Sequence, residues 1–397
     1  MTLGAITRAA FERAQGACTG RDILAVQDTT VTRSSGGGGH YLHAMIAVDA
    51  HNGAVLGALD ALFLERTSGK SASRDEREPE ARESHRWLAA TERAAQIAGA
   101  ERITVVADRE ADMFDLFARR PENVALIVRA HHDRALATSA RTGTRTGTRV
   151  AEQIATMPRL GCMELALPAL SGRPARLAKL SVRFGKMSIK PPRRMEKFGV
   201  ASVPLTYVDL REETPPYGVK PIHWRLLTTY DIATGEDALD VARRYAKRWK
   251  IEEVFRTMKR KGFDIEGLRI ADTAPRNKLI LACFIAATVV MQMVGARDGS
   301  QNDLGLRPLT DAFDPSDQPI LQALNAELEG KTKRQQNPHP KESLAFATWV
   351  CARLGGWTGY YGKPGPIVIL RGWTEFQSIK HGTILTKAHE NNHQILV

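Results

Sequence analysis

Residues 237–262 are predicted to form one long helix, and one side of it carries side chains suited to phosphate and metal chemistry. At about 100° per residue, four polar side chains fall within a stripe of about 60°. Arginine and lysine bind phosphate oxygens, and a carboxylate beside them can hold a metal ion. An ordinary surface helix with scattered charges has the same pattern. The four residues are Tyr245, Arg248, Glu252 and Lys259.

Two further acids stand where apolar runs end. Asp28 follows the run DILAVQ, and Asp108 follows RITVVA. Acids at strand ends are common, but the helix that carries Glu252 also has an apolar stripe that must pack on the same core. Three carboxylates without clustered histidines suit Mg²⁺ better than zinc, because hard cations prefer oxygen ligands. Two such ions about 4 Å apart can promote phosphoryl transfer. The apolar stripe consists of Ile251, Val254, Phe255 and Met258.

The elements that position these acids follow a recognisable order. DILAVQDTT, HYLHAMIAVDA and GAVLGALDALFLE are predicted to be strands, and His51-Asn52-Gly53 between the last two indicates a hairpin. RWLAATERAAQIAG is predicted to be helical, ERITVVA a strand, DMFDLFARR a short helix and VALIVRA a strand. Three strands, a helix, a strand, a helix and a strand is the order of an RNase H-like core.

The rest of the chain has a different character. Short alternating runs broken by Gly and Pro predict an all-β segment over residues 131–230. The apolar run 279–294 is short for a membrane span, which needs about 20 residues, and predicts a buried core helix. Residues 295–340 are polar and predicted to be rich in loops. One amphipathic helix, SLAFATWVCARLGG, precedes a tail rich in Gly, Pro and Trp.

The charge of the chain favours an acidic partner. Lys and Arg total 56 against 44 Asp and Glu, which gives a net charge of +12 and a pI near 9.7. Such a protein usually binds nucleic acid, although a ribosome-associated protein or a simply basic enzyme has the same balance. The four cysteines are far apart, which argues against a disulfide framework or a zinc site and fits a reducing compartment. No membrane role is expected.

Three strings of residues closely resemble one family. QDTT around Asp28, VVADREADMFDL around Asp108 and YAKRWKIEEVFRTMK around Glu252 resemble the insertion-sequence IS-four family of DDE transposases, which includes Tn-five transposase. The last string carries that family's Y-x2-R-x3-E-x6-K signature without a spacing error. The likeness covers most of residues 20–275 and continues more weakly into ARLGGWTGYYGKPGP.

The resemblance implies a role for each residue. Asp28, Asp108 and Glu252 would be the catalytic residues and would bind two Mg²⁺ (or Mn²⁺) ions. The cut strand's phosphates would be held by Tyr245, Arg248 and Lys259.

Two further DNA contacts follow from the same resemblance. Arg129, in VALIVRA, would touch DNA near the active site. Trp224, in HWRLLTTY, would stack on a base flipped out near the transposon end, and a core aromatic in a strand is the alternative. For Glu110 and Asp112, charges at a helix N-terminus are an alternative to a role in DNA or metal binding.

We therefore predict an α/β fold with an RNase H-like (retroviral-integrase-like) catalytic core interrupted by an all-β insertion, and a mostly helical C-terminal region. Five parts are expected, as follows. They are residues 1–19 (a remnant of an N-terminal helical region), 20–130 (first part of the core), 131–230 (β-insertion), 231–295 (the part of the core with the glutamate helix) and 296–397 (dimerisation region).

The expected function is cut-and-paste transposition of an insertion sequence by metal-dependent phosphodiester hydrolysis and strand transfer. The partners would be double-stranded DNA, as transposon ends and target, and a second copy of the chain in a synaptic complex. The expected location is the bacterial cytoplasm, on the nucleoid when bound to DNA. Because Asp28 lies early compared with the family, an N-terminally truncated copy that dimerises with and inhibits full-length transposase is the alternative. An in-frame upstream extension would favour the enzyme.

Overall fold

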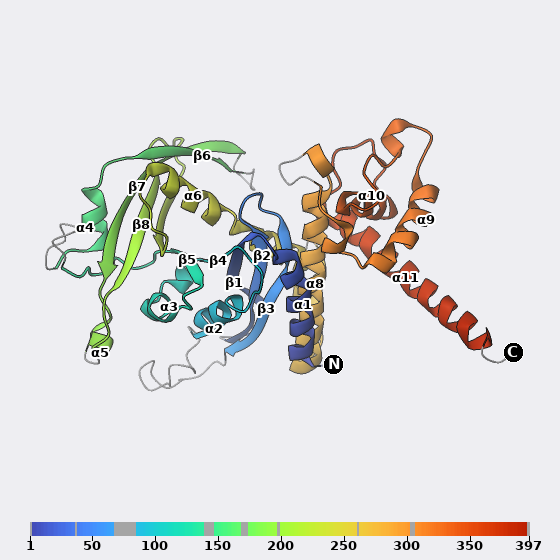
Figure 1. The fold of residues 1–397 in the computed structure, drawn as a ribbon, viewed down its shortest axis with the longest axis horizontal. Helices are drawn as coiled ribbons and strands as arrows, with labels where there is room; N and C mark the ends of the chain where they lie inside the picture. Colours follow the sequence, from blue (N-terminus) through green and yellow to red (C-terminus); the bar gives the residue numbers. More distant parts are fainter. Residues whose placement is uncertain are drawn as a thin grey trace.

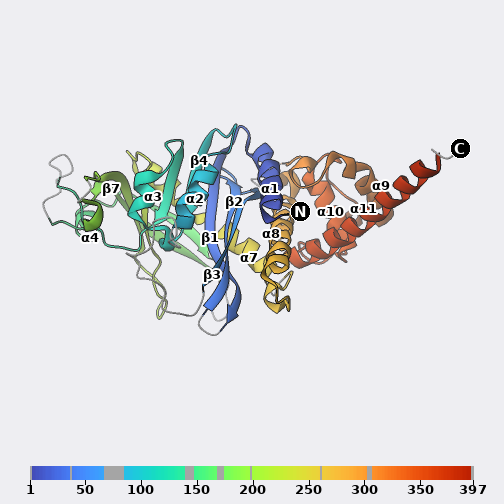
Figure 2. The same ribbon diagram turned by 90° about the horizontal axis from the view of Figure 1, so that it is seen from below.

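The computed structural model describes most of the chain, and Figures 1 and 2 show it from two directions. The described residues are 2–35, 38–66, 85–138, 147–167, 174–196, 199–259, 262–301 and 306–394.

Five strands form the half of the sheet that carries the two aspartates. β1 (Asp22–Ser35), β2 (Gly38–Asp49) and β3 (Val55–Arg66) form an antiparallel meander. β4 (Arg102–Ala107) pairs parallel with β1, and β5 (Val124–Arg129) pairs parallel with β4. The order is therefore β3-β2-β1-β4-β5. The predicted strands and the hairpin between β2 and β3 are confirmed.

Four more strands continue the same sheet. β9 (His223–Thr228) pairs antiparallel with β5, and β8 (Val203–Glu212), β7 (Arg176–Ile189) and β6 (Gly161–Leu167) follow in antiparallel order. The prediction of strands in this part of the chain is therefore confirmed, and they extend the core sheet to nine strands. The prediction that the segment is all-β is wrong, because two short helices lie in it. These are α4 (Val150–Ala155) and α5 (Arg193–Glu196).

Helices cover both faces of the first five strands. α1 (Leu3–Cys18), α2 (His85–Ala94) and α3 (Phe114–Arg119) share one apolar core with one face of the sheet. Residues of α6 (Gly235–Ala246), α7 (Trp249–Met258) and α8 (Thr273–Ala296) share a second core with the opposite face. Both faces of the strands are therefore buried, which explains why their sequences read as nearly continuous apolar runs.

The alternation of side chains along β1 decides which face each polar residue meets. Ile23 belongs to the core beneath α1–α3, whereas Leu24 belongs to the core beneath α6–α8. Because the period of a strand is two residues, Asp28 continues the series of Leu24 and Thr29 continues that of Ile23. Two consecutive polar residues therefore serve opposite faces of the sheet.

The predicted single helix over residues 237–262 is wrong. The chain forms α6 (Gly235–Ala246) and α7 (Trp249–Met258), separated by a turn. In this turn the amide of Arg248 bonds the carbonyl of Tyr245 at 2.9 Å, three residues back. Such i→i−3 bonds tighten the chain and change the direction of the helix. Neither Gly nor Pro marks the break, so nothing in the local sequence indicated it.

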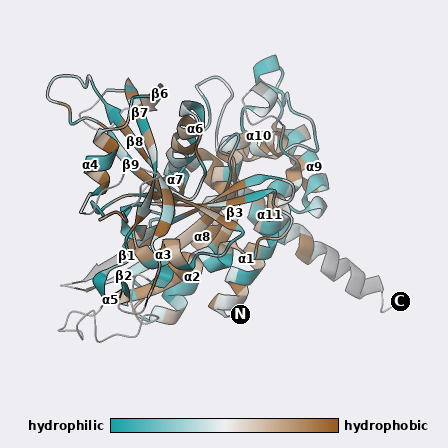
Figure 3. Ribbon diagram, turned by 60° about the vertical axis from the view of Figure 1, so that its left-hand side comes forward, coloured by the Kyte–Doolittle hydropathy of each residue, from teal (hydrophilic) through white to brown (hydrophobic). Residues whose placement is uncertain are grey.

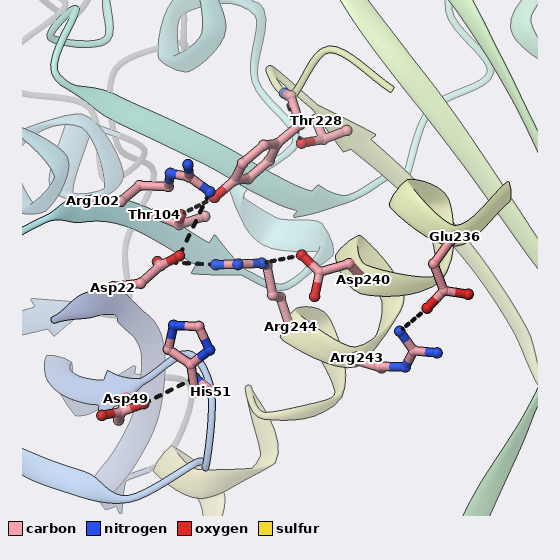
Figure 4. A network of polar contacts seen from close by, with 11 residues as sticks. Asp22, Asp49, His51, Arg102, Thr104, Thr228, Glu236, Asp240, Arg243 and Arg244 are labelled. Carbon is pink, nitrogen blue, oxygen red and sulfur yellow. Dashed lines mark hydrogen bonds and ion pairs between the residues drawn. The ribbon is translucent and has the colours of Figure 1, made fainter. Parts of the chain in front are cut away.

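A buried ion pair fastens α6 to the start of β1 (Figure 4). Nη1 of Arg244 lies 3.0 Å from Oδ1 of Asp22, and its Nε lies 2.6 Å from Oδ2 of Asp240. Arg102 approaches the other oxygen of Asp22 at 3.6 Å. Removing one partner of a buried pair leaves an uncompensated charge, so this contact fixes where α6 and the turn after it lie.

The long apolar helix α8 (Thr273–Ala296) joins the sheet to the C-terminal helices. Its length and composition would suffice to cross a membrane, but 61% of its most apolar window is buried inside the protein. Its residues belong both to the core on the sheet and to a third core, and hydrophobic colours run along it in Figure 3. The predicted buried core helix is thereby confirmed.

Three helices form the C-terminal region beyond α8. α9 (Gln318–Leu328), α10 (Leu344–Leu354) and the long α11 (Pro366–Gln394) pack beside it (Figure 1). α10 is the predicted amphipathic helix. The mostly helical C-terminal region is confirmed, although α9 and α11 themselves lie in sequences that read as loops and as a tail rich in Gly, Pro and Trp.

Candidate active site

The guanidinium group of Arg248 joins two of the three predicted acids. Its Nη1 lies 2.8 Å from Oδ2 of Asp28, and its Nη2 lies 2.6 Å from Oε1 of Glu252. Asp28 reaches this point from the α7 side of β1, and Glu252 from the first turn of α7. The break between α6 and α7 places Arg248 itself between the two carboxylates. Arg248 lies 220 residues from Asp28 in the chain, so carboxylates from distant segments meet on one planar cation.

Asp108 stands beside Asp28 at the end of the neighbouring strand. β1 and β4 are parallel, and Val26 pairs with Val106. Asp28 lies two residues after Val26, and Asp108 lies two residues after Val106. Oδ1 of Asp108 accepts the amide of Glu110 at 2.8 Å, so Asp108 caps a short 3-10 turn, η2 (Arg109–Ala111). The parallel register therefore brings the predicted aspartates to the same level of the sheet.

Negative charge accumulates around Asp28. The pKa of its carboxyl group is raised to about 6, chiefly by burial and also by the charges of Asp108 and Glu252, whereas Arg248 and the amide of Thr29 act in the opposite direction. The cationic Arg248 thus offsets only part of the cost of ionising Asp28. A site of this kind favours an added cation.

An open pocket of about 480 Å³ gives access to the two joined carboxylates. Lys259, the residue after α7, lines it with its Nζ 3.3 Å from Oε1 of Glu266. Three of the predicted residues, Asp28, Glu252 and Lys259, are among its lining residues, whereas Asp108 is not. The lining consists of Asp28, Thr29, Thr30, Glu252, Phe255, Arg256, Lys259 and Glu266.

The donor atoms suit a hard divalent cation, although they are not arranged as a finished cage. Within the described ranges, no three Asp, Glu, His or Cys side chains are grouped so that they could hold a metal ion. Carboxylate oxygens are nevertheless the ligands that Mg²⁺ prefers. Two of the three predicted carboxylates hold a guanidinium group instead, so an ion that bound them would displace Arg248.

Tyr245 and Trp224 form an aromatic pair next to Arg248. Their ring centroids lie 5.2 Å apart in an edge-to-face arrangement, and Tyr245 is 4% exposed. Burial raises the pKa of Tyr245, whereas the positive charges of Arg248 and Arg129 lower it. Tyr245 is therefore largely a core residue whose hydroxyl group lies near two arginines. Trp224 is half-buried, with one part of its ring packed on Tyr245.

Arg129 lies at the end of β5, with its Nη2 3.3 Å from the carbonyl of His223 on β9. Its effect on Tyr245 places it in the electrostatic surroundings of the same site. The predicted DNA contacts Tyr245, Arg248, Trp224 and Arg129 therefore lie in one neighbourhood, whereas Lys259 lines the pocket with Asp28 and Glu252.

Arg86 is a residue that the sequence did not reveal. From α2, its Nη2 bonds Oε2 of Glu110 at 2.9 Å and its Nε approaches Oγ1 of Thr29 at 3.4 Å. The amide of Thr29 in turn donates to Oδ1 of Asp28 at 2.7 Å. Arg86 thus links the residue after Asp28 to the turn that Asp108 caps. Nothing in the sequence marks Arg86, because its burial on α2 becomes apparent only in the folded structure.

A buried histidine completes this support on the α2 face. Nδ1 of His43 lies 2.9 Å from Oγ1 of Thr29, and its Nε2 lies 3.3 Å from Oε1 of Gln27. Gln27 also donates to Oγ1 of Thr91 on α2 at 3.0 Å, and the ring of His43 meets Trp87 edge-on. Burial and, to a smaller extent, the charge of Arg86 lower the pKa of His43 to about 3, so this imidazole is neutral at pH 7.

Glu110 and Asp112 take structural contacts. Glu110 pairs with Arg86, as described above. Asp112 accepts the amides of His131 and His132 at 2.7 and 2.9 Å and the guanidinium group of Arg134 at 2.6 Å. The carboxylate of Asp112 is thereby used to hold the chain after β5.

A comparison with models of protein families assigns most of the chain to one family. The model of the transposase DDE domain matches residues 19–289, which include all three acids, the four residues of the helix signature, Arg129 and Trp224. The match covers more than half of the 397 residues. Transposases of this family move DNA segments by cutting and joining strands. This chain belongs to the transposase DDE domain family.

Proposed function

We propose that this protein catalyses cut-and-paste transposition of an insertion sequence, as a member of the IS-four branch with an RNase H-like core. Asp28, Asp108 and Glu252 would hold two Mg²⁺ or Mn²⁺ ions. The observation that carries this proposal is the pair of bonds from Arg248 to Asp28 and Glu252, because it brings carboxylates from β1 and α7 together beside the end of β4. Bound ions would activate the attacking oxygen, first of water and then of a 3′-hydroxyl group, and would stabilise the leaving oxygen.

The cations of the site would position the DNA strand. Arg248 would exchange the carboxylates for a phosphate oxygen when the acids take up ions, since a planar guanidinium group binds either anion with two parallel bonds. Lys259, which lines the pocket, would hold a second phosphate as a point charge. Arg129 would contact the strand from the end of β5. Together these residues would fix the scissile phosphate without reading its sequence.

Trp224 would stack on a base displaced from the duplex at the transposon end. Its ring is half-buried, and Tyr245 supports it edge-on, which leaves part of the ring available. An aromatic platform of this kind binds any base, at about 1–3 kcal/mol per base. A second copy of the chain would join the synaptic complex through the C-terminal region.

A cleavage assay tests this function. A duplex that carries the element's own ends is incubated with the 397-residue chain in Mg²⁺ or in EDTA, and Asp28→Asn serves as the matched inactive variant. We expect nicks at the element boundary that require both Mg²⁺ and Asp28. Cleavage that is equal in EDTA, or equal in the variant, would contradict the assignment of the carboxylates.

A further inference from the structure

A second pocket lies in the C-terminal region, away from the carboxylates. It has a volume of about 180 Å³ and lies among the end of α8, the loop between α9 and α10, and the chain that leads into α11. The pocket at the carboxylate site contains Asp28, Glu252 and Glu266, but neither Asp nor Glu lines this one. Its charged groups are all basic, which makes it a candidate site for an anion.

Four basic residues and two tryptophans give the pocket its character. Lys333 and Arg334 lie on an exposed 3-10 turn, η7 (Lys333–Gln335), and neither forms an ion pair with any described acid. Arg297 bonds the carbonyl of Pro364 at 2.9 Å through Nη1, while its buried Nε has no hydrogen-bond partner among the described residues. The remaining members of this group are His339, Trp349 and Trp357.

The pocket is held in shape before any ligand binds. The hydroxyl groups of Thr332 and Tyr360 lie 2.8 Å apart and tie η7 to the turn after α10. At Gly359 the same turn approaches so closely that a Cβ atom would lie 2.5 Å from the carbonyl oxygen of Arg334. A preformed site loses less conformational entropy when it binds.

The chemistry of the walls favours a nucleic-acid backbone over base edges. Trp357 uses its only donor, Nε1, on the carbonyl of Gly362 at 3.1 Å, so its ring offers an apolar surface without a donor for reading a base. Lys333 and Arg334 supply the charge that phosphate oxygens require. A sugar–phosphate backbone presents both an apolar sugar and an anion.

We propose that this C-terminal pocket binds the phosphodiester backbone of duplex DNA, independently of sequence, as a contact separate from the carboxylate site. The inference rests on the proposed function only in that the protein handles DNA. It gives the C-terminal region a role in holding DNA besides any role in dimer formation.

The test compares two double variants of the full chain, each of which removes two positive charges. Lys333→Ala/Arg334→Ala alters the pocket, and the matched control Arg8→Ala/Arg119→Ala alters exposed basic residues on α1 and α3. Binding to two labelled duplexes of unrelated sequence is measured by fluorescence anisotropy in EDTA. The salt concentration is varied from about 50 to about 200 mM, a range over which phosphate contacts change the affinity strongly. All four replaced side chains are exposed, and circular dichroism checks that both variants fold.

We expect the pocket variant to bind both duplexes roughly tenfold more weakly, and the slope of log K against log salt to fall by about 1 to 2, because each lost phosphate contact contributes about 0.9. The control should keep the wild-type slope. An unchanged slope in the pocket variant, or an equal loss in the control, would overturn the pocket while leaving the proposed function intact. A wild-type chain that binds neither duplex would overturn both proposals.

Discussion

Arg248 lies between Asp28 and Glu252, 2.8 Å from one carboxylate and 2.6 Å from the other, in the place that we propose for a divalent cation. The arginine keeps two like charges together in the absence of an ion, and burial still raises the pKa of Asp28 to about 6. The site is therefore held at a cost to stability, which metal binding should reduce.

The first prediction concerns that cost. In EDTA at pH 7, we expect Asp28→Asn to stabilise the protein, because the charged form of Asp28 is disfavoured in the folded state. A rise in pKa from 3.8 to about 6 corresponds to an upper limit of about 3 kcal/mol. The native state binds the extra proton, so this penalty is present above pH 6 and disappears as the pH falls towards 3.8. Loss of the bond to Arg248 will reduce the gain.

Thermal unfolding with and without Mg²⁺ measures the stabilisation by Asp28→Asn and the stabilisation by the metal ion. Mg²⁺ should raise the Tm of the wild-type chain and leave that of Asp28→Asn unchanged. Asp60→Asn is a useful control, because burial also raises the pKa of Asp60, which does not line the pocket. Equal shifts with Mg²⁺ in the wild-type and Asp28→Asn chains would show that the ion binds elsewhere.

The second prediction separates chemistry from DNA binding. Glu252→Gln keeps the length of the side chain and can still accept a bond from Arg248, but it loses the negative charge. We expect cleavage to fall by a factor on the order of 10³ or more, with DNA affinity within about twofold, because the phosphate contacts come from cations. Glu253→Gln, one residue along the same helix, is the matched control and should cleave normally. Undiminished cleavage by Glu252→Gln would remove it from the catalytic group.

Much of this site follows from the sequence, and the reasons are local. Two apolar runs that are followed by Asp28 and Asp108 predicted two buried strands, and a helical spacing predicted that Arg248 and Glu252 share a side. The strand period turns Asp28 towards α7, and the parallel register of β1 and β4 places Asp108 beside it. The break at residues 247–248 was not predictable, because tertiary contacts such as Arg244 with Asp22 fix it rather than a Gly or Pro.

Contacts through space account for the residues that were missed. Arg86 meets Glu110 and Thr29 only after α2 has packed on the sheet, and the spacing in sequence carries no trace of that. The C-terminal helix α11 was missed for a different reason. Its sequence follows a segment rich in Gly and Pro and has no apolar stripe of its own, so periodicity gave no signal.

The third prediction concerns Arg86 as a positioning residue. Arg86→Met removes the link between the segments that follow the two aspartates, whereas Arg86→Lys keeps the charge but loses the fork that reaches both partners. We expect cleavage to fall by about 10- to 100-fold in Arg86→Met, the range that is typical when supports of metal ligands are removed. The Mg²⁺ concentration for half-maximal cleavage should rise, while DNA affinity stays unchanged.

A purely structural role would give a different result. In that case Arg86→Met would lower the Tm and the amount of active protein, but the surviving fraction would cleave with the wild-type dependence on Mg²⁺. Arg93→Met, also on α2, is the matched control, because Arg93 packs on the ring of Phe11 and bonds Gln96 rather than a residue next to either aspartate. An unchanged Mg²⁺ dependence in Arg86→Met would contradict the positioning role.

The last prediction follows from His43, which is buried and neutral behind Asp28. The pKa of His43 is lowered from 6.5 to about 3 in the folded protein, so between those values the unfolded chain binds a proton that the folded chain does not. The free energy of unfolding should therefore fall as the pH drops below 6.5, at up to about 1.4 kcal/mol per pH unit for this one group. Asp28 acts in the opposite direction between pH 6 and 3.8, so the wild-type slope is a sum of both effects.

Single variants separate the contributions of His43 and Asp28 to the pH dependence of stability. Denaturant unfolding in EDTA at several pH values between 4.5 and 7.5 should give a shallower acid slope for His43→Gln than for the wild-type chain, whatever its absolute stability. Asp28→Asn should give a steeper slope, because it removes the opposing group. His51→Gln, at an exposed position in the hairpin, is the control and should leave the slope unchanged. If His43→Gln kept the wild-type slope, the imidazole would have to be protonated in the folded state, and its bonds to Thr29 and Gln27 would need a different assignment of donors.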